Sequence, residues 1–283
     1  MVEVSIALPT YNRAHSLERC IMSVKEQTFK DFELLVIDDG STDQTPEIVS
    51  KLKKSDNRIH YHKNKQNLGL PKSRNIAIGM TKSDLIFFIE DDLILERQCL
   101  EILFNTYQEL DAKQIQIGAI GPRLIEPNQQ KISSNPQVVV KIDKLTGMIT
   151  ANWGIEVHGI IEVPTLHSCS LIHKSVFKTA GLYDYNYYKG SAFREETDFY
   201  YRVKRAGFKL FFQSTAITYH YPQSSGGCFL SPFRNRFFEM RNHLLFIGKF
   251  YGFKTLFMVP SFLLYSSARA IQFFKGSSVH RNS

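Results

Sequence analysis

Three consecutive carboxylates, Glu90, Asp91 and Asp92, directly follow the most hydrophobic run of the chain. Neighbouring acids at the buried end of a strand repel one another unless a cation or hydrogen-bond donors compensate their charge. Mg²⁺ and Mn²⁺ prefer such oxygen ligands and bridge them to phosphates. The triplet therefore predicts a divalent-metal site. The alternative is that these acids merely cap a helix that begins near Leu95.

Two further acidic clusters could take part in the same chemistry. Asp38-Asp39 follows the apolar run 32–37, although an acid before Gly40 is also ordinary turn chemistry. Glu195-Glu196 opens a helical pattern, and acids are favoured at a helix start whether or not they act chemically. The functional alternative is that one of these glutamates acts as a general base. When a chemical group is transferred to a hydroxyl oxygen, a carboxylate can take the proton of that hydroxyl.

The elements that must position these clusters alternate between strands and helices. We expect strands near residues 4–8, 32–37, 59–62 and 85–89, with helices beginning near residues 16, 45 and 71. Continuous apolar runs of this kind are typical of a parallel sheet covered on both faces, and the alternation indicates an α/β fold. Ligands of such sheets bind at the carboxyl ends of the strands. The segment Thr10–Arg13, the pair Asp38-Asp39 and the acidic triplet all fall there.

The second half of the chain is less regular. We expect strands near residues 117–120, 138–142, 210–212 and 216–221, and helices over residues 174–180 and 195–206. The only tryptophan, Trp153, and the pair His167-Ser168 could line an acceptor site or pack in the core.

Two nucleotide-binding classes are excluded by missing motifs. No G-x-G-x-x-G follows the first strand, and no G-x-x-x-x-G-K-[ST] occurs in the chain. An α/β domain without a glycine-rich phosphate loop has to balance a diphosphate in another way. A cation held by carboxylates does so, which agrees with the metal site predicted from the triplet.

The cysteines and the N-terminal residues bear on the compartment. The four cysteines are scattered without a C-x-x-C pair, so we expect neither a disulfide framework nor a zinc site. The first residues lack the basic lead and apolar core of a signal peptide, and no N-x-S/T sequon occurs. Together these features predict a cytoplasmic protein.

Positive charge is concentrated at the C-terminal end. Residues 231–283 contain eight Lys or Arg and the single acid Glu239, so this segment carries +7 of the net charge of +8. Its apolar runs are interrupted by Lys249, Lys254 and Pro260 and are too short to span a bilayer. One alternative is a pair of amphipathic helices lying on an anionic membrane. The other is a pair of helices packed on the catalytic domain. Nucleic acid is not expected as a partner, because no known binding motif accompanies the basic residues.

Five motifs occur in the order found in family 2 glycosyltransferases, which the chain resembles over roughly residues 3–221. They are Pro9–Arg13, Val36–Asp43, Asn67-Leu68-Gly69 with Arg74-Asn75, Glu90–Asp92 and Arg194–Asp198. The resemblance implies inverting enzymes of the GT-A fold, a single Rossmann-like α/β domain with a mostly parallel central sheet. We therefore expect a GT-A domain over residues 1–230, with a nucleotide-binding half (1–115) and an acceptor half (116–230). A basic, aromatic helical tail follows over residues 231–283.

The resemblance also implies roles for individual residues. Asp92 would ligate Mg²⁺ or Mn²⁺, and His220 would approach the metal or the diphosphate as a similar histidine does in some relatives. Glu196 matches the catalytic base, but Glu195 stays a second candidate because this chain has Glu-Glu where Glu-Asp is commoner. The residues that would bind the nucleotide-sugar are Pro9, Thr10, Tyr11, Arg13, Asp39, Lys72, Arg74 and Asp91.

These roles predict an inverting, metal-dependent transferase. We expect it to move one sugar from a UDP- or dTDP-sugar to a glycan or lipid-linked acceptor, in polysaccharide or glycolipid synthesis. The Q-x-x-R-W motif of the processive synthases is absent. Two alternatives remain. One is a sugar nucleotidyltransferase, but this class needs a glycine-rich phosphate loop, and the segment Pro9–Arg13 is not glycine-rich. The other is a non-catalytic sugar-binding protein. We expect the protein in the cytoplasm, with peripheral contact at the inner face of the cell membrane.

Overall fold

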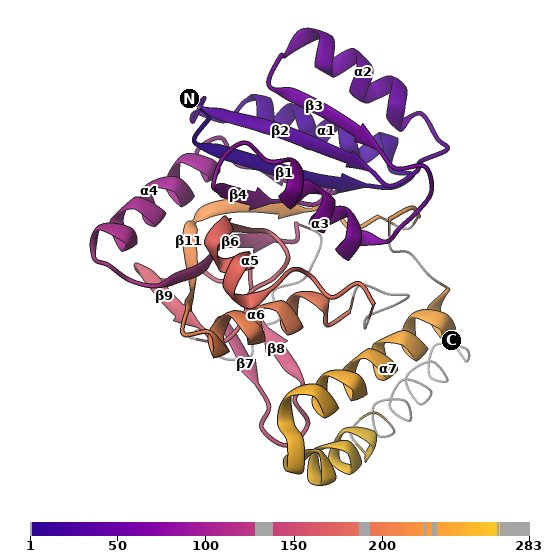
Figure 1. Ribbon diagram of the computed structural model, residues 1–283, viewed down its shortest axis with the longest axis vertical. Coiled ribbons are helices and arrows are strands. Elements are labelled where there is room, and N and C mark those ends of the chain that lie inside the picture. Colours follow the sequence, from indigo (N-terminus) through magenta and orange to yellow (C-terminus); the bar gives the residue numbers. More distant parts are fainter. Residues whose placement is uncertain are drawn as a thin grey trace, which may run out of the picture.

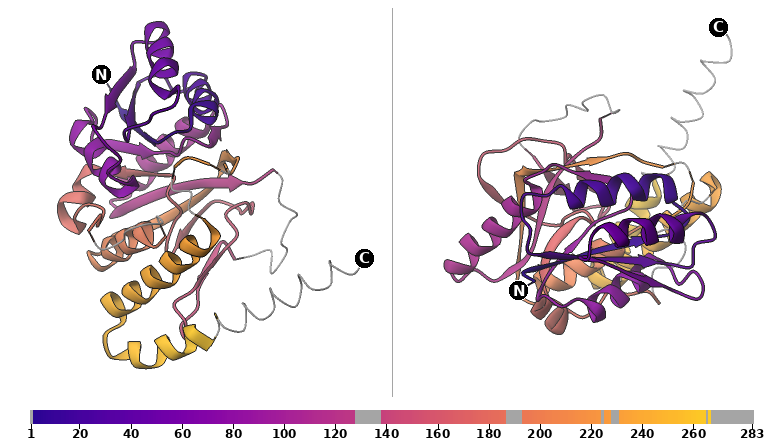
Figure 2. Two further views of the ribbon diagram at one scale, coloured as in Figure 1. Left: turned by 90° about the vertical axis from the view of Figure 1, so that its right-hand side faces the viewer. Right: turned by 90° about the horizontal axis from the view of Figure 1, so that it is seen from above.

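The computed structural model describes residues 2–127, 138–186, 193–223, 225–227, 231–264 and 266. Within these residues one sheet of nine strands forms the centre of the molecule, and helices cover both of its faces (Figure 1). A helical tail extends from the far end of the molecule, away from the N-terminal strands (Figure 2). This arrangement confirms the expected single α/β domain with an appended C-terminal helix.

The first half of the sheet is parallel and runs in the order β3-β2-β1-β4. Its members are β1 (Val4–Thr10), β2 (Phe32–Asp38), β3 (Ile59–Lys63) and β4 (Leu85–Phe88). Every residue of β1, β2 and β4 is buried, as their continuous apolar runs predict for strands covered on both faces.

The second half adds strands of both directions. β10 (Ser170–His173) pairs antiparallel with β4 and with β6 (Ile117–Ile125). β11 (Lys209–His220) runs parallel to β6, while β5 (Leu93–Leu95) and β9 (Ile160–Val163) pair antiparallel with β11. Most strands of the described sheet therefore share one direction, which confirms the mostly parallel sheet.

A layer of helices covers each face of the sheet, and an apolar core lies between the sheet and each layer. The first core contains buried side chains of α1 (Ala14–Lys25), α2 (Thr45–Ser55) and α4 (Cys99–Ala112). The second contains those of α3 (Leu70–Met80), α5 (Lys174–Ala180) and α6 (Glu195–Arg205). Alternate strand residues point to opposite faces, so Ile6 belongs to the first core and Ala7 to the second. Cys20, Cys99 and Cys169 are buried and free, and no pair of them forms a disulfide.

Two expectations about the elements are wrong. No helix begins near Leu95, because residues 93–95 form β5, and α4 begins only at Cys99. The acidic triplet therefore precedes a strand, and helix capping does not explain it. The expected strands 210–212 and 216–221 are one strand, β11, with a register shift between Gln213 and Ile217. A separate hairpin is formed by β7 (Val140–Ile142) and β8 (Ile149–Ala151).

The tail consists of α7 (Pro232–Tyr251), a 3₁₀ turn η1 (Gly252–Lys254) and a second helical stretch over residues 255–264. Among the described residues, no helix is both long and apolar enough to cross a membrane. The boundary at residue 230 and the division into halves at residue 115 stay predictions.

Candidate active site

The acidic triplet lies where β4 leaves the core and the edge strand β5 begins. β5 places Leu93 opposite His220, so the end of β11 lies beside the triplet. Glu90, Asp92 and His220 each offer an atom that could ligate a metal ion, and these atoms lie within 4.8 Å of one another. We call these three residues the metal-ligand cluster. Asp92 Oδ1 is buried without a hydrogen-bond partner among the described residues, which leaves an oxygen available to an ion. Two carboxylates and an imidazole fit the Mg²⁺ or Mn²⁺ predicted from the sequence.

Arg13 supplies the nearest positive charge to this cluster. Its Nη1 lies 2.5 Å from Asp92 Oδ2 and 3.3 Å from Asp91 Oδ1. Although burial opposes it, hydrogen bonding and the charge of Asp92, helped by Glu126, raise the pKa of His220 to about 9. Against the effect of burial, the contact with His220 lowers the pKa of Asp92. Asp91 differs, because burial raises its pKa to about 7 despite the charge of Arg13. The two aspartates are thus electrostatically distinct.

The end of β1 brings the first predicted nucleotide contacts to the same edge of the sheet. Thr10 Oγ1 donates a 2.7 Å hydrogen bond to Asp91 Oδ2. Pro9 and Thr10 are buried, whereas Tyr11 and Arg13 are half-buried. Asp91 therefore belongs with Thr10, beside the metal-ligand cluster and outside it.

Asp39 holds the loop that leads into α3. Its Oδ1 accepts hydrogen bonds from Asn64 Nδ2 (2.8 Å) and from the backbone N–H of Leu68 (2.9 Å), and its Oδ2 accepts one from Gly69 N–H (2.8 Å). Gly40 makes this approach possible, because a Cβ there would lie 2.8 Å from the carbonyl carbon of Gln66 and its φ is +85°. Gly40 is thus a bend with a positive φ, and Asp39 fixes the loop beside the predicted nucleotide site.

The two basic side chains of α3 that are predicted to contact the donor, Lys72 and Arg74, have different surroundings. Lys72 is half-buried, with Nζ 5.3 Å from the centre of the Tyr185 ring. Arg74 is only 1% exposed. Its Nη1 lies 2.6 Å from Glu195 Oε1, and its Nη2 lies 3.2 Å from Glu90 Oε1. The neighbours of Arg74 are carboxylates, and its contact with a diphosphate stays a prediction.

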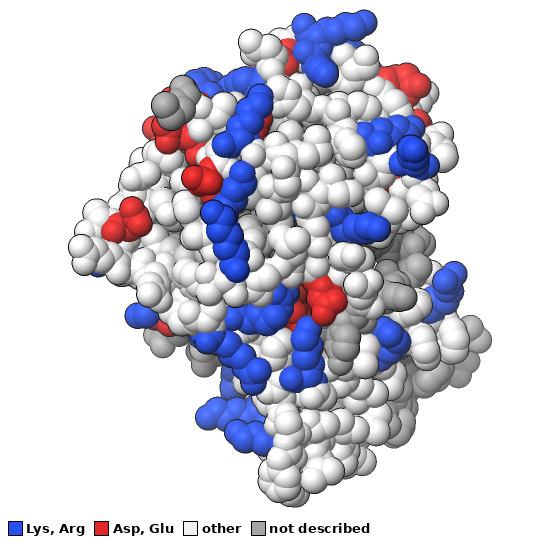
Figure 3. All heavy atoms as spheres, viewed as in Figure 1, with Lys and Arg blue, Asp and Glu red and all other residues white. Residues whose placement is uncertain are grey.

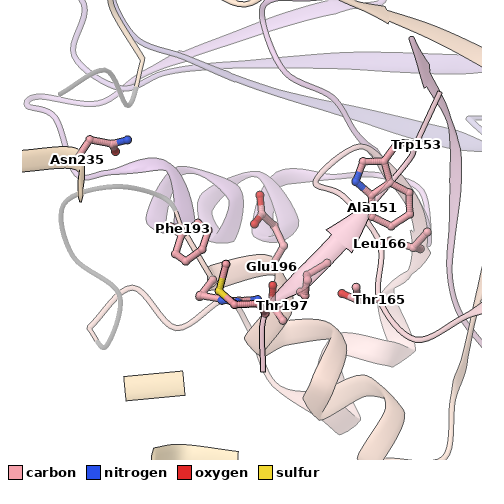
Figure 4. A pocket seen from close by; sticks show the side chains of 11 residues that line it. Ala151, Trp153, Thr165, Leu166, Phe193, Glu196, Thr197 and Asn235 are labelled. Carbon is pink, nitrogen blue, oxygen red and sulfur yellow. The ribbon is translucent and has the colours of Figure 1, made fainter. Parts of the chain in front are cut away.

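The two adjacent candidate bases at the start of α6 have different environments. The Glu195 side chain is fully buried against Arg74. The Glu196 side chain is 23% exposed and lines a cavity, where its carboxylate points toward open space between Phe193 and Trp153 (Figure 4). Burial, with a contribution from the Glu90 carboxylate, raises the pKa of Glu196 although Arg74 acts against the rise. A carboxylate with a raised pKa and access to a cavity is suited to accept a proton near neutral pH.

The cavity has a volume of about 500 Å³. Its wall comes from the β8 hairpin, the segment before β10, the start of α6 and one residue of the tail. The lining residues are Met148, Ile149, Ala151, Trp153, Thr165, Leu166, Phe193, Arg194, Glu196, Thr197 and Asn235. Trp153 therefore faces the cavity, as one of its two predicted roles requires. His167 packs behind it, with ring centres 5.1 Å apart, and its Nε2 lies 2.8 Å from the Pro122 carbonyl oxygen.

Some residues of the site carried no readable local signal. Glu126 Oε1 lies 3.2 Å from His220 Nδ1 and orients that ring, yet the two residues are 94 positions apart. Gly227 N–H donates a 2.7 Å hydrogen bond to the Tyr11 carbonyl oxygen, and a Cβ at Gly227 would lie 2.7 Å from Arg13 Nε. The Gly226-Gly227 pair was the only hint in the sequence that a chain segment approaches closely there.

The tail packs against the site through one face of α7. Arg194 precedes α6 with a φ of +79° and lies with its Nη2 2.8 Å from His243 Nδ1 and 3.2 Å from the Gly147 carbonyl oxygen. Burial and the charge of Arg194 lower the pKa of His243 to about 3, so the neutral ring accepts this hydrogen bond. Phe246, one turn further along α7, is also buried. Through this inner face α7 packs on the domain, which is one of the two arrangements predicted for the tail.

Comparison with known proteins agrees with this geometry. A family model described as "Glycosyl transferase family 2" matches residues 5–177. Over 125 residues the chain is 37% identical to the poly(ribitol-phosphate) beta-N-acetylglucosaminyltransferase TarP of Staphylococcus aureus. Over 110 residues it is 37% identical to the GalNAc(5)-diNAcBac-PP-undecaprenol beta-1,3-glucosyltransferase of Campylobacter jejuni. These matches cover 43% and 38% of this chain, and only 37% and 36% of the two relatives.

Solved structures share the fold over most of the chain. The crystal structure of S. aureus TarS aligns with 87% of this chain and 39% of its own, with a TM-score of 0.59 and 20% identity. A TarS fragment, residues 1–349, solved in complex with UDP, aligns with 87% of this chain and 65% of its own, with a TM-score of 0.57 and 17% identity. At this identity the likeness shows the fold.

Proposed function

The chain belongs to glycosyl transferase family 2, and on that premise we propose that it is an inverting glycosyltransferase. It moves one sugar from a nucleotide-diphosphate sugar to a hydroxyl group of a glycan or lipid-linked acceptor, in polysaccharide or glycolipid synthesis. One observation carries the proposal. The Arg74 guanidinium lies between Glu90 of the metal-ligand cluster (3.2 Å) and Glu196 (3.7 Å), whose carboxylate points into the cavity.

The donor occupies the edge of the sheet at the ends of β1, β2 and β4. In this proposal Thr10, Tyr11 and Asp91 contact the nucleoside, and Asp39 accepts a hydrogen bond from a uracil or thymine base. We expect the nucleotide of the donor to be UDP or dTDP. The TarS fragment, which shares the fold, was solved in complex with UDP, and this supports UDP. Arg13 lies on the carboxylates of Asp91 and Asp92, so it is placed to exchange that contact for one with the diphosphate.

A divalent ion held by Glu90, Asp92 and His220 would supply positive charge to the departing diphosphate. His220 has to give up its proton before it can act as a ligand, because the pKa of its ring is raised to about 9 by Asp92 and Glu126. Glu126 then orients the ring from the far side.

The acceptor hydroxyl enters from the cavity. Its oxygen attacks the anomeric carbon of the donor sugar while the bond from that carbon to the diphosphate oxygen breaks. Glu196 takes the hydroxyl proton, and the anomeric configuration is inverted because attack and departure occur on opposite faces. Trp153 and Phe193, which both line the cavity, offer apolar ring faces to an acceptor sugar.

The decisive experiment measures nucleotide release from a panel of nucleotide-sugars, with Mn²⁺, with Mg²⁺ and with a chelator. The donor is first found by its thermal stabilisation of the protein in the presence of Mn²⁺. We expect release only with UDP- or dTDP-sugars and only with an added divalent ion. Full activity in chelator would refute the metal-assisted mechanism. Stabilisation by a donor without any release, across all acceptors tested, would instead favour the non-catalytic sugar-binding protein.

We further propose that the reaction takes place at the cytoplasmic face of a membrane, with peripheral contact through the basic tail. Two observations support it. Cys20, Cys99 and Cys169 are free, as is usual in a reducing compartment. Residues 231–283 carry eight basic residues against one acid, which favours an anionic surface.

A further inference from the structure

We propose that the turn of the tail, residues 252–264, is a docking surface whose apolar side chains insert into an anionic lipid bilayer. We call this segment the tail tip. The inference deepens the proposed function and rests on it in one respect, since a lipid-linked acceptor would give such docking its purpose. The tip lies at the extremity of the molecule, at the lower end of Figure 1 and of the left view in Figure 2.

The tail tip is apolar on two opposite sides. Its inner side packs on α7 through Met258 and Phe262, which are 2% and 4% exposed and lie against Ile247. Its outer side carries four large apolar side chains that are 66–76% exposed, namely Phe253, Leu256, Phe257 and Leu264. A helix that only covered the domain would turn polar side chains outward, whereas an apolar outer side is typical of contact with a nonaqueous phase.

The charge of the tail suits an anionic surface. Glu239 is the only acid in residues 231–283, and its carboxylate is held on α7 itself by Asn235 and Arg236. Lys254 belongs to the turn itself. Lys249 points inward instead, with Nζ 2.7 Å from Asp198 Oδ2. On the face shown in Figure 3 the red spheres of Asp and Glu lie above the tip, and no red sphere is visible on the lower end. The tip itself, residues 252–264, contains Lys254 and no acid, so its own charge attracts phosphate headgroups.

A bilayer fits this surface better than a second copy of the chain does. Stable protein interfaces bury about 800 Å² on each partner across a fairly flat patch. The tip is a protruding turn between two helices, with Gly252 at a φ of +51°. Such a wedge of aromatic and aliphatic side chains enters the headgroup layer with little area needed around it.

α7 links the tip to the cavity. Asn235, in the first turns of α7, lines the cavity together with Glu196. At 1.5 Å per residue, the helix axis from Asn235 to Tyr251 measures roughly 24 Å. Docking of the tip would therefore hold the cavity near the membrane surface, where a lipid-linked acceptor presents its sugar.

The test is co-sedimentation of the full chain with vesicles at low salt. Vesicles of phosphatidylcholine alone are compared with vesicles containing about one-third phosphatidylglycerol, the anionic share being chosen to give a clear surface potential. The test variant replaces Phe253, Leu256, Phe257 and Leu264 by Ser. The control variant replaces Met22 of α1 and Met80 of α3 by Ser in the same way. These are two large apolar side chains that are 40% and 41% exposed and lie outside the tail.

We expect the wild type and the control to partition onto the anionic vesicles, and the four-residue variant to bind at least tenfold more weakly. Thermal unfolding shows that each variant is folded, and nucleotide release with a short soluble acceptor should be the same in all three. Equal binding of the test variant and the wild type would overturn the proposal. So would loss of a dimer, seen by light scattering, without a change in vesicle binding, because a second copy would then cover the tip. Vesicle binding without any sugar transfer would keep the docking surface and refute the proposed function instead.

Discussion

Arg74 Nη1 lies 2.6 Å from Glu195 Oε1, and both side chains are almost completely withdrawn from solvent. The pair joins α3 to α6. The same guanidinium lies 3.2 Å from Glu90 Oε1 and 3.7 Å from Glu196 Oε1. One buried cation is therefore shared by an acid of the metal-ligand cluster and the candidate base, so a change at Arg74 reaches both.

Replacing Arg74 by Met should destabilise the fold strongly. The change leaves Glu195 as a buried charge without its partner, which typically costs about 3–5 kcal/mol. Chemical denaturation measures the loss. Adding Glu195→Gln to Arg74→Met should restore a large part of it, because a neutral amide then replaces the buried carboxylate. The exposed pair of Lys113 and Glu109 is the control, and Lys113→Met should cost less than about 1 kcal/mol. Additive effects of the two buried changes would contradict the coupling.

Replacing Glu196 by Gln should leave the fold and donor affinity intact while transfer slows by roughly 10²–10⁴-fold. The amide keeps the size of the side chain but cannot take the acceptor proton. Rates of nucleotide release and donor binding by calorimetry provide the two readouts. Glu195→Gln is the matched comparison, and we expect it to act mainly on stability. If Glu195→Gln abolished transfer in a folded protein while Glu196→Gln did not, the roles of the two acids would be exchanged.

The pH dependence of transfer should report the environment of Glu196. Burial and the Glu90 carboxylate raise the pKa of Glu196, and only the deprotonated form accepts a proton. Activity should therefore fall as pH drops through this raised pKa, with an acidic limb above the usual glutamate value of about 4.3. A profile of turnover from about pH 3 to about pH 8, at saturating metal and donor, tests it, because this range begins about one unit below the usual value and extends well above it. An acidic limb at or below the usual value would mean that another group is the base.

Replacing Asp92 by Asn should weaken Mn²⁺ binding at least about tenfold, because the cluster loses a charged ligand. Direct titration of the protein with Mn²⁺ in the absence of donor reads this without reference to activity. Asp91→Asn is the matched control, since Asp91 is hydrogen-bonded to Thr10 and lies outside the metal-ligand cluster. We expect Asp91→Asn to weaken nucleotide binding and to leave Mn²⁺ binding within about threefold, less than one 1.4 kcal/mol step of affinity. Loss of Mn²⁺ binding in Asp91→Asn alone would move the metal site to that residue.

Local patterns were enough to predict most elements of the fold. The helix over residues 174–180 is confirmed to the residue, and its end at Gly181 is fixed by a left-handed backbone (φ +79°) that glycine adopts without strain. The strand expected at residues 32–37 is confirmed as β2, one residue longer. These features depend on neighbours within a few positions along the chain. The helix expected near Leu95 failed because residues 93–95 pair with β11, about 125 positions further on.

The order of the sequence motifs by itself indicated the family. The alternation of apolar runs with helical patterns predicted the parallel arrangement of the first four strands, and with it the gathering of acids at their carboxyl ends. Only the tertiary structure decided which of two adjacent glutamates faces the cavity. Glu195 and Glu196 are chemically identical, and successive positions on a helix point about 100° apart, so packing against Arg74 buries one and exposes the other. The same holds for the tail, whose basic and apolar composition was evident in the sequence. Which of its apolar side chains pack inward and which remain exposed depends on contacts between segments that are remote along the chain.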